Sequence, residues 1–204
     1  LQWPCCFGMS LGEHYKFHMR TILCILGTLL LLPFPTIKAA APSFLEEIRP
    51  VLSAPDQWHD MSDVLQKLAL MEKGADQNIK PGIVMLRQKL NEYKNYFSER
   101  SLTLSSEDKS ALFKIVLAYE KVFQDERQRL LKLWNDHPEL LSDSPPTVLP
   151  QWREGDTELL KCFPIFSKHA SNRSDAIGLA SSYMEIMHGY GHLLDRIYIK
   201  SIEP

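Results

Sequence analysis

Apolar residues recur three or four positions apart along most of the chain beyond residue 42. This spacing puts them on one face of an α-helix, whereas a half-buried strand would need an apolar residue at every second position. No alternating stretch of useful length occurs in the sequence. The pattern therefore predicts an all-α fold.

Capping residues, prolines and glycines set the expected helix bounds. Ser43 is expected to cap a short element that Pro50 interrupts, Asp56 to cap the next helix, and Ser105 with Asp108 to form a capping box. The expected helices span residues 43–52, 56–73, 81–97, 105–134, 156–163 and 174–200. The four longest lead us to predict an antiparallel bundle of four principal helices plus short helices.

Residues 135–156 break the helical pattern, because four prolines in this segment exclude one regular helix. A segment of this length without regular structure is uncommon in a compact domain. Leu140, Val148 and Trp152 are apolar enough to pack against other elements. We expect one long Pro-rich crossover loop that lies on the bundle.

Residues 19–41 have the pattern of a secretory signal peptide. Arg20 precedes an uncharged apolar stretch, which ends at Pro33 and Pro35 and is followed by a run of alanines. The apolar stretch is shorter than the roughly 20 residues that a membrane span requires. We expect a protein that is secreted or periplasmic and meets the membrane only transiently, with a retained anchor as the alternative.

Residues 1–18 precede this leader and are interpreted as upstream sequence or a wrongly assigned start, with Met19 or Met9 as the true beginning. Residues 42–204 then form a single helical domain that includes loop 135–156. Cys162 is the one cysteine in that domain, so no disulfide can form within it. The domain must be held together by its apolar core.

The formal net charge of the whole chain is -2, and no run of five like charges occurs. After loss of residues 1–41, 20 Lys and Arg and 24 Asp and Glu remain, which gives a net charge of -4. A protein that binds nucleic acid through a broad face needs clustered basic residues. No nucleic acid is therefore expected as a partner.

The best candidate for a chemical site is a set of four residues: Glu185, His188, His192 and Asp195. Two histidines four residues apart on a helix can bind one metal ion, so a divalent transition metal such as zinc, copper or nickel is possible. On a helical wheel these four residues lie opposite Tyr183, Ile186 and Leu193, which places them outward. An ordinary solvated helix face is the simpler interpretation, with the metal site as its alternative, and no cofactor is expected.

Other chemistry is thinly represented. Cys162 and His169 could form a nucleophile pair, but a packed core thiol is the simpler interpretation. Gly189 and Gly191 suggest that a neighbouring helix approaches closely, or that the helix bends. The common nucleotide-binding, zinc-protease and serine-hydrolase motifs are missing from the sequence.

These observations favour an exported, non-enzymatic protein that acts through protein–protein interaction, as an adaptor, an assembly factor or a secreted effector. The first alternative is an extracytoplasmic protein that binds a metal or a small ligand. The second is a hydrolase of the cell envelope.

The leader gives a direct prediction. The chain recovered from outside the cytoplasm should begin at Ala40, Ala41 or Pro42, because cleavage is expected after Ala39, Ala40 or Ala41. The first two starts are preferred, because proline is an awkward first residue. The mass of the denatured protein checks this. A mature chain that still carries residues 19–39 would show that the apolar stretch is an anchor.

Overall fold

The computed structural model describes residues 37–138 and 152–202, and these residues are all-helical, as the periodicity predicts. The helices are α2 (Ile37–Leu52), η1 (Pro55–Asp60), α3 (Ser62–Gly74), α4 (Lys80–Ser98), α5 (Ser106–Asp136), α6 (Trp152–Leu159), η3 (Leu160–Cys162), α7 (Phe163–His169) and α8 (Arg173–Ile202). Residues 1–36, and with them most of the predicted leader, lie outside the description, as does most of the loop predicted at 135–156. None of the helices in the described part combines the length and apolar character of a membrane span.

The long helices α5 and α8 match their predicted bounds to within about two residues, and the predicted cap of α5 is confirmed. The Ser105 hydroxyl accepts a hydrogen bond from the Asp108 backbone N–H at 3.1 Å. This bond satisfies one of the donors that a helix start leaves without a partner. The capping pair therefore fixes where α5 begins.

Three of the expected helices have other bounds in the structure. Helix α6 begins at Trp152, inside the loop predicted at 135–156, and ends at Leu159, whereas the expected helix spanned 156–163. Helix α2 begins before Ser43 and continues through Pro50, which is exposed and lies less than one turn from the helix end. Pro50 has no N–H to donate, so one backbone carbonyl of the preceding turn lacks its helical partner. Near the exposed end of the helix, that carbonyl can bond water instead.

The expected helix 56–73 is divided at Met61 into η1 and α3. Asp56 does not cap it, because its carboxylate accepts a hydrogen bond from the Leu104 N–H and forms an ion pair with the Lys109 ammonium group. Asp56 therefore fastens the segment that precedes α5 instead of starting a helix.

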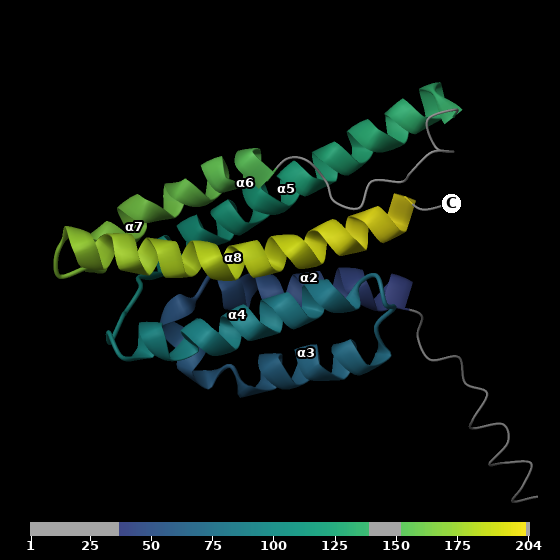
Figure 1. Ribbon diagram of the computed structural model, residues 1–204. Helices are drawn as coiled ribbons and strands as arrows, with labels where there is room; N and C mark the ends of the chain where they lie inside the picture. The colour runs from purple at the N-terminus through teal and green to yellow at the C-terminus, as the bar shows by residue number, and fades with distance from the viewer. Residues whose placement is uncertain (1–36, 139–151, 203–204) are drawn as a thin grey trace, which may run out of the picture. The chain divides into compact units, whose positions relative to one another are not determined.

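Helix α8 lies between α4 on one side and α5 on the other (Figure 1). Gly82 of α4 lies at Leu193, Lys89 at Glu185 and Tyr96 at Gly178, so α4 and α8 run antiparallel. By contrast, α5 and α8 run parallel, because Glu120 meets Tyr190 and Arg127 meets Ser201.

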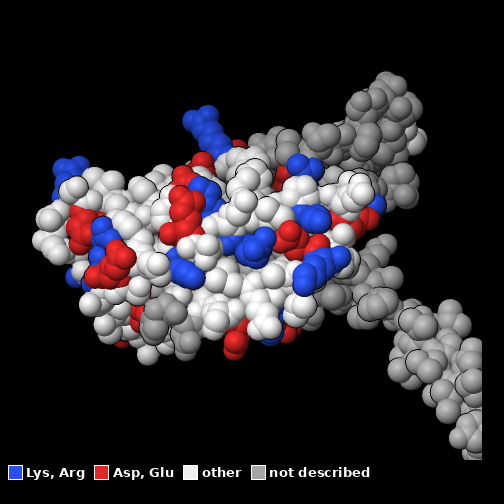
Figure 2. Space-filling model, turned by 60° about the horizontal axis from the view of Figure 1, so that its bottom comes forward, with Lys and Arg blue, Asp and Glu red and all other residues white. Residues whose placement is uncertain are grey.

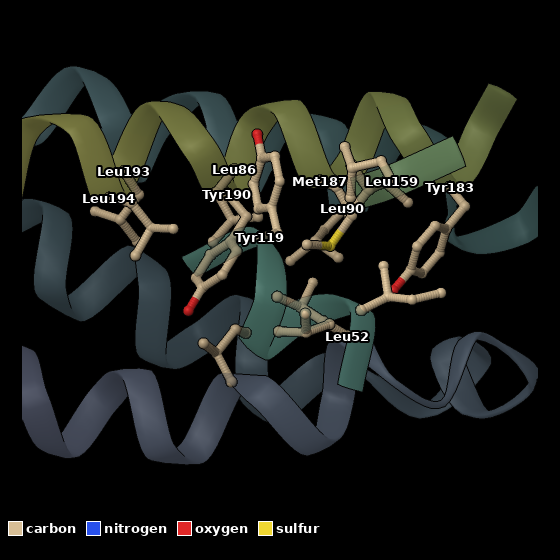
Figure 3. Packing of buried hydrophobic residues seen from close by; sticks show 14 of the residues in the cluster. Leu52, Leu86, Leu90, Tyr119, Leu159, Tyr183, Met187, Tyr190, Leu193 and Leu194 are labelled. Carbon is tan, nitrogen blue, oxygen red and sulfur yellow. The ribbon is translucent and has the colours of Figure 1, made fainter. Parts of the chain in front are cut away.

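Most of the core side chains of α8 are fully buried (Figure 3). The apolar face predicted for this helix is confirmed by Tyr183, Ile186, Tyr190, Leu193 and Leu194, which have no exposed surface. They pack against side chains of α4 and α5 such as Leu86, Leu90 and Tyr119. A helix covered from two sides in this way organises the described core.

Glycines bring α4 and α8 unusually close together. A Cβ added at Gly82 would lie 2.6 Å from the Leu193 Cα and 2.8 Å from the His192 carbonyl oxygen. A Cβ at Gly189 would lie 3.1 Å from the Leu86 Cα. The close approach that the sequence suggested for Gly189 is thus confirmed, and Gly82 supplies its counterpart on the facing helix.

A buried carboxylate joins three other elements. Glu120 of α5 is 2% exposed and accepts hydrogen bonds from the Arg49 Nε of α2 at 2.8 and 3.0 Å. It also accepts one from the Tyr190 hydroxyl of α8. Burial, and then the nearby Glu120, raise the pKa of Tyr190 well above its usual value, so the phenol remains a donor.

The glycine contact predicts the effect of one methyl group. Gly82→Ala should destabilise the protein by about 1–3 kcal/mol, because the new Cβ meets backbone atoms that cannot move independently. Gly74→Ala is the matched control: its Cβ meets nothing within 4 Å, and alanine restricts the unfolded chain, so we expect no loss of stability. Urea unfolding of both variants measures the difference, and equal stabilities would contradict the close approach.

Candidate functional site

A groove of about 680 Å³ lies where the end of α4, the end of α7 and the start of α8 meet. Its lining is mostly polar and includes Tyr96, Arg100, His169, Ser171 and Asp175. The volume lies within the range of about 300–1,000 Å³ that is usual for ligand sites. Charged and aromatic side chains of the described residues therefore face the same groove.

Arg100 is held in this groove by three contacts. Its guanidinium lies 3.4 Å from the centre of the Tyr96 ring, its Nε donates to the Asp175 carboxylate at 3.1 Å, and its Nη1 donates to the Tyr96 carbonyl at 3.0 Å. A cation over an aromatic face is attracted by the ring's electron density. The side chain is still 34% exposed, so the guanidinium is fixed in position but accessible.

The start of α8 positions Asp175 for this contact. The Asn172 side chain accepts a hydrogen bond from the Asp175 N–H at 3.0 Å, which caps the helix. The Asp175 carboxylate in turn accepts from the Ser171 N–H at 3.1 Å. That backbone bond first, and then Arg100, lower the pKa of Asp175, so it stays ionised opposite the guanidinium.

Gly178 provides the space for Tyr96. A Cβ at Gly178 would lie 2.4 Å from the tyrosine hydroxyl, so a larger residue there would displace the phenol from its place against the backbone of α8. The ring on which Arg100 stacks is therefore positioned by helix packing.

A second carboxylate anchors the wall formed by α7. Asp108 is buried and accepts hydrogen bonds from the Lys168 ammonium at 2.9 Å, the Ser105 hydroxyl at 2.8 Å and the His169 Nε2 at 3.0 Å. The bond from Lys168, followed by those from His169 and Ser105, holds the pKa of Asp108 well below its usual range. This cluster ties the end of α7 to the start of α5.

The four residues proposed as metal ligands are placed apart from this groove and have separate partners. Glu185 pairs with Lys89 at 2.7 Å, and His188 pairs with Asp156 of α6 at 2.7 Å. His192 lies against the Trp152 ring, with 4.7 Å between the ring centres. In the described residues, no group of three or more His, Cys, Asp and Glu side chains is arranged to hold a metal ion.

The predicted outward orientation is wrong for Asp195, which is fully buried. His188 and His192 are each half-buried. For the two histidines, the reason is that α6 packs on the side of α8 that the helical wheel assigns to solvent. A wheel built from one helix cannot show that a second helix covers its polar side.

Cys162 is fully buried, and this burial raises the pKa of its thiol to about 12. The thiolate required for nucleophilic attack is therefore scarce at neutral pH. The suggested partner His169 is bound to Asp108. The packed-thiol interpretation fits this environment.

Sequence reasoning did not find Arg100, Tyr96 or Asp175 as a site. Arg100 and Asp175 are 75 residues apart in the chain and meet only because α4 and α8 are antiparallel. The nearest signal in the sequence is Asn172, a helix-capping residue three positions before Asp175. Comparisons of this chain with known protein families, with curated proteins and with solved structures find no match.

The Asp108 cluster predicts a pH-dependent stability difference. Asp108→Asn should cost about 2 kcal/mol at neutral pH, because it removes a buried charge that accepts three side-chain hydrogen bonds. The folded pKa is depressed, so this stability is present above the unfolded value of about 3.9 and is lost as the pH falls through the folded value.

Urea unfolding of the wild type and the variant at neutral pH and below about pH 4 measures the gap. The control is Asp125→Asn, which removes an exposed pair with Lys121 and should change stability little. A gap between wild type and Asp108→Asn that stays constant over this range would contradict the assignment.

Proposed function

We propose that this chain is an exported, non-enzymatic helical protein that acts by binding another protein, with the groove at α4, α7 and α8 as its contact site. The observation that supports this most is the fixed and accessible guanidinium of Arg100, stacked on Tyr96. Arginine and tyrosine are among the residues that contribute most to binding energy at protein interfaces. Because Arg100 is already held in place, a partner would not have to order it.

The donor edge of Arg100 is suited to a partner's carbonyl or carboxylate. Its Nε and Nη1 are engaged, whereas its Nη2 makes no hydrogen bond within the described residues. Ile177, next to Gly178 on α8, is 48% exposed and could add apolar contact. A polar anchor next to an apolar side chain is a common composition of interfaces.

The rest of the proposal concerns the scaffold and its location. We propose that four principal helices form a bundle, in which α4 and α8 run antiparallel while α5 and α8 run parallel, and that the leader 19–41 sends the chain to the periplasm or the medium. The first buried residue among the described side chains is Phe44, so cleavage after Ala39 or Ala40 would leave the described core intact.

Charge argues against nucleic acid as the partner. On the face in Figure 2, basic and acidic side chains are interspersed. A phosphate backbone would be attracted by a patch of one sign.

A small polar ligand is the second candidate occupant of the same groove. The volume of about 680 Å³ and the polar lining favour it, and they do not favour an apolar ligand. A protein and a small molecule would give adducts of very different mass, so one experiment separates the two proposals.

The test places a photo-crosslinking residue at Ser174, which is exposed and lines the groove, in the cell that makes the protein. The control position is Gln128, which is exposed on α5 near the opposite end of α8. We expect an adduct with one defined protein from Ser174 and none from Gln128.

Arg100→Ala should weaken binding of that partner by about 2 kcal/mol, roughly thirtyfold in Kd. Arg100→Lys should also weaken it, since lysine keeps the charge but cannot stack as a planar group. A small-mass adduct at Ser174 would favour the ligand candidate, and equal crosslinking at both positions would contradict the assignment of the groove.

A further inference from the structure

Helix α6 is fastened to α8 by a small cluster of side chains around His192. The His188 ring nitrogen lies 2.7 Å from the Asp156 carboxylate of α6. The Trp152 ring of α6 contacts His192, and it also lies edge-on to Phe123 of α5. Two histidines with different partners therefore contribute to the attachment.

Close packing leaves little room around this cluster. A Cβ at Gly191 would lie 2.2 Å from the Tyr119 hydroxyl and 2.7 Å from the Trp152 ring. The indole of α6 thus lies directly on the backbone of α8. Protonation of His192 would place a positive charge next to this close contact between α6 and α8.

Two of the charged and titratable groups around His192, Arg196 and His188, are unfavourable to a positive charge on its ring. His188 and Arg196 neighbour it on α8, and Asp195 follows it in the chain. From α6 it faces Trp152, while the carboxylate of Asp156 is engaged by His188. The hydroxyl of Tyr119 approaches from α5, and Gly82, which carries no charge, approaches from α4.

We propose that the attachment of α6 to α8 is acid-sensitive, and that protonation of His192 weakens it. A protonated His192 would be a half-buried cation beside Arg196 and His188. The nearest carboxylate on α6 is already in use. Detachment of α6 would return the ring to water, where the charge is solvated.

Burial first, and then Arg196 and His188, lower the pKa of His192 below its ordinary value of 6.5. The attached form therefore binds fewer protons than the detached form. By linkage, the stability of the attachment is complete above about pH 6.5 and decreases as the pH falls toward the lowered pKa. Asp108, whose pKa is far below this range, does not take part in the change.

Hydrogen exchange of the full chain at about pH 7.5 and about pH 5, corrected for intrinsic exchange rates, tests the proposal. Amides of α6 should lose protection several-fold at the lower pH, while those of α4 should keep theirs. Equal protection of α6 at both pH values would overturn the proposal. Greater protection at the lower pH would also overturn it, because attraction between the imidazolium and the indole of Trp152 would then dominate.

Three variants identify the titrating group. His192→Gln should keep α6 protected at the higher pH and abolish the pH dependence. His192→Phe retains a ring against Trp152 and should behave in the same way, which guards against a packing defect in the first variant. His188→Gln breaks the bond to Asp156, so it should lower protection at both pH values but leave the pH dependence. If both His192 variants respond to acid as the wild type does, the proposal is wrong.

Discussion

The close approach of α4 and α8 at Gly82 and Gly189 is the constraint on which much of the described structure depends. Two backbones this near to each other admit one antiparallel register, because a shift along either helix would place a side chain where only glycine fits. That register sets Lys89 opposite Glu185 and Tyr96 opposite Gly178. Arg100, one turn beyond Tyr96, is thereby brought to Asp175. The groove is therefore a consequence of helix packing that begins about four turns away.

The second organising interaction is electrostatic. Glu120 is buried, so it must be paired, and its partners come from α2 and α8. Replacing such a group by an apolar residue can leave stability unchanged, whereas removing one partner strands a buried charge. The contacts of Glu120 with Arg49 and Tyr190 therefore contribute less to net stability than to the arrangement of the helices. They require that α2, α5 and α8 meet at one place. Packing of apolar side chains alone would tolerate more than one such arrangement.

Local features of the sequence predicted the helices well, and features that depend on two distant segments were missed. The Ser105 cap and the apolar face of α8 follow from residues within one helix, and both are confirmed. Asp195 was expected to face solvent because the helical wheel considers one helix at a time, but packing with other elements leaves it fully buried. Asp56 has the chemistry of a cap, but it bonds Leu104, 48 residues away. The pair of Arg100 and Asp175 spans 75 residues, and no spacing rule reaches that far.

The segment formed by α6, η3 and α7 is held to the rest of the fold by two polar clusters that respond to acid over different pH ranges. Toward its start, His192 must remain neutral beside Trp152, and acid opposes this. At its end, Lys168 and His169 bind Asp108, whose carboxylate stays ionised at any pH at which His192 titrates. A fall in pH should therefore loosen α6 and leave the end of α7 in place. Because His169 lines the groove from that end, the proposed binding site and the proposed acid-sensitive contact are separated by an anchor that holds over the pH range in which His192 titrates.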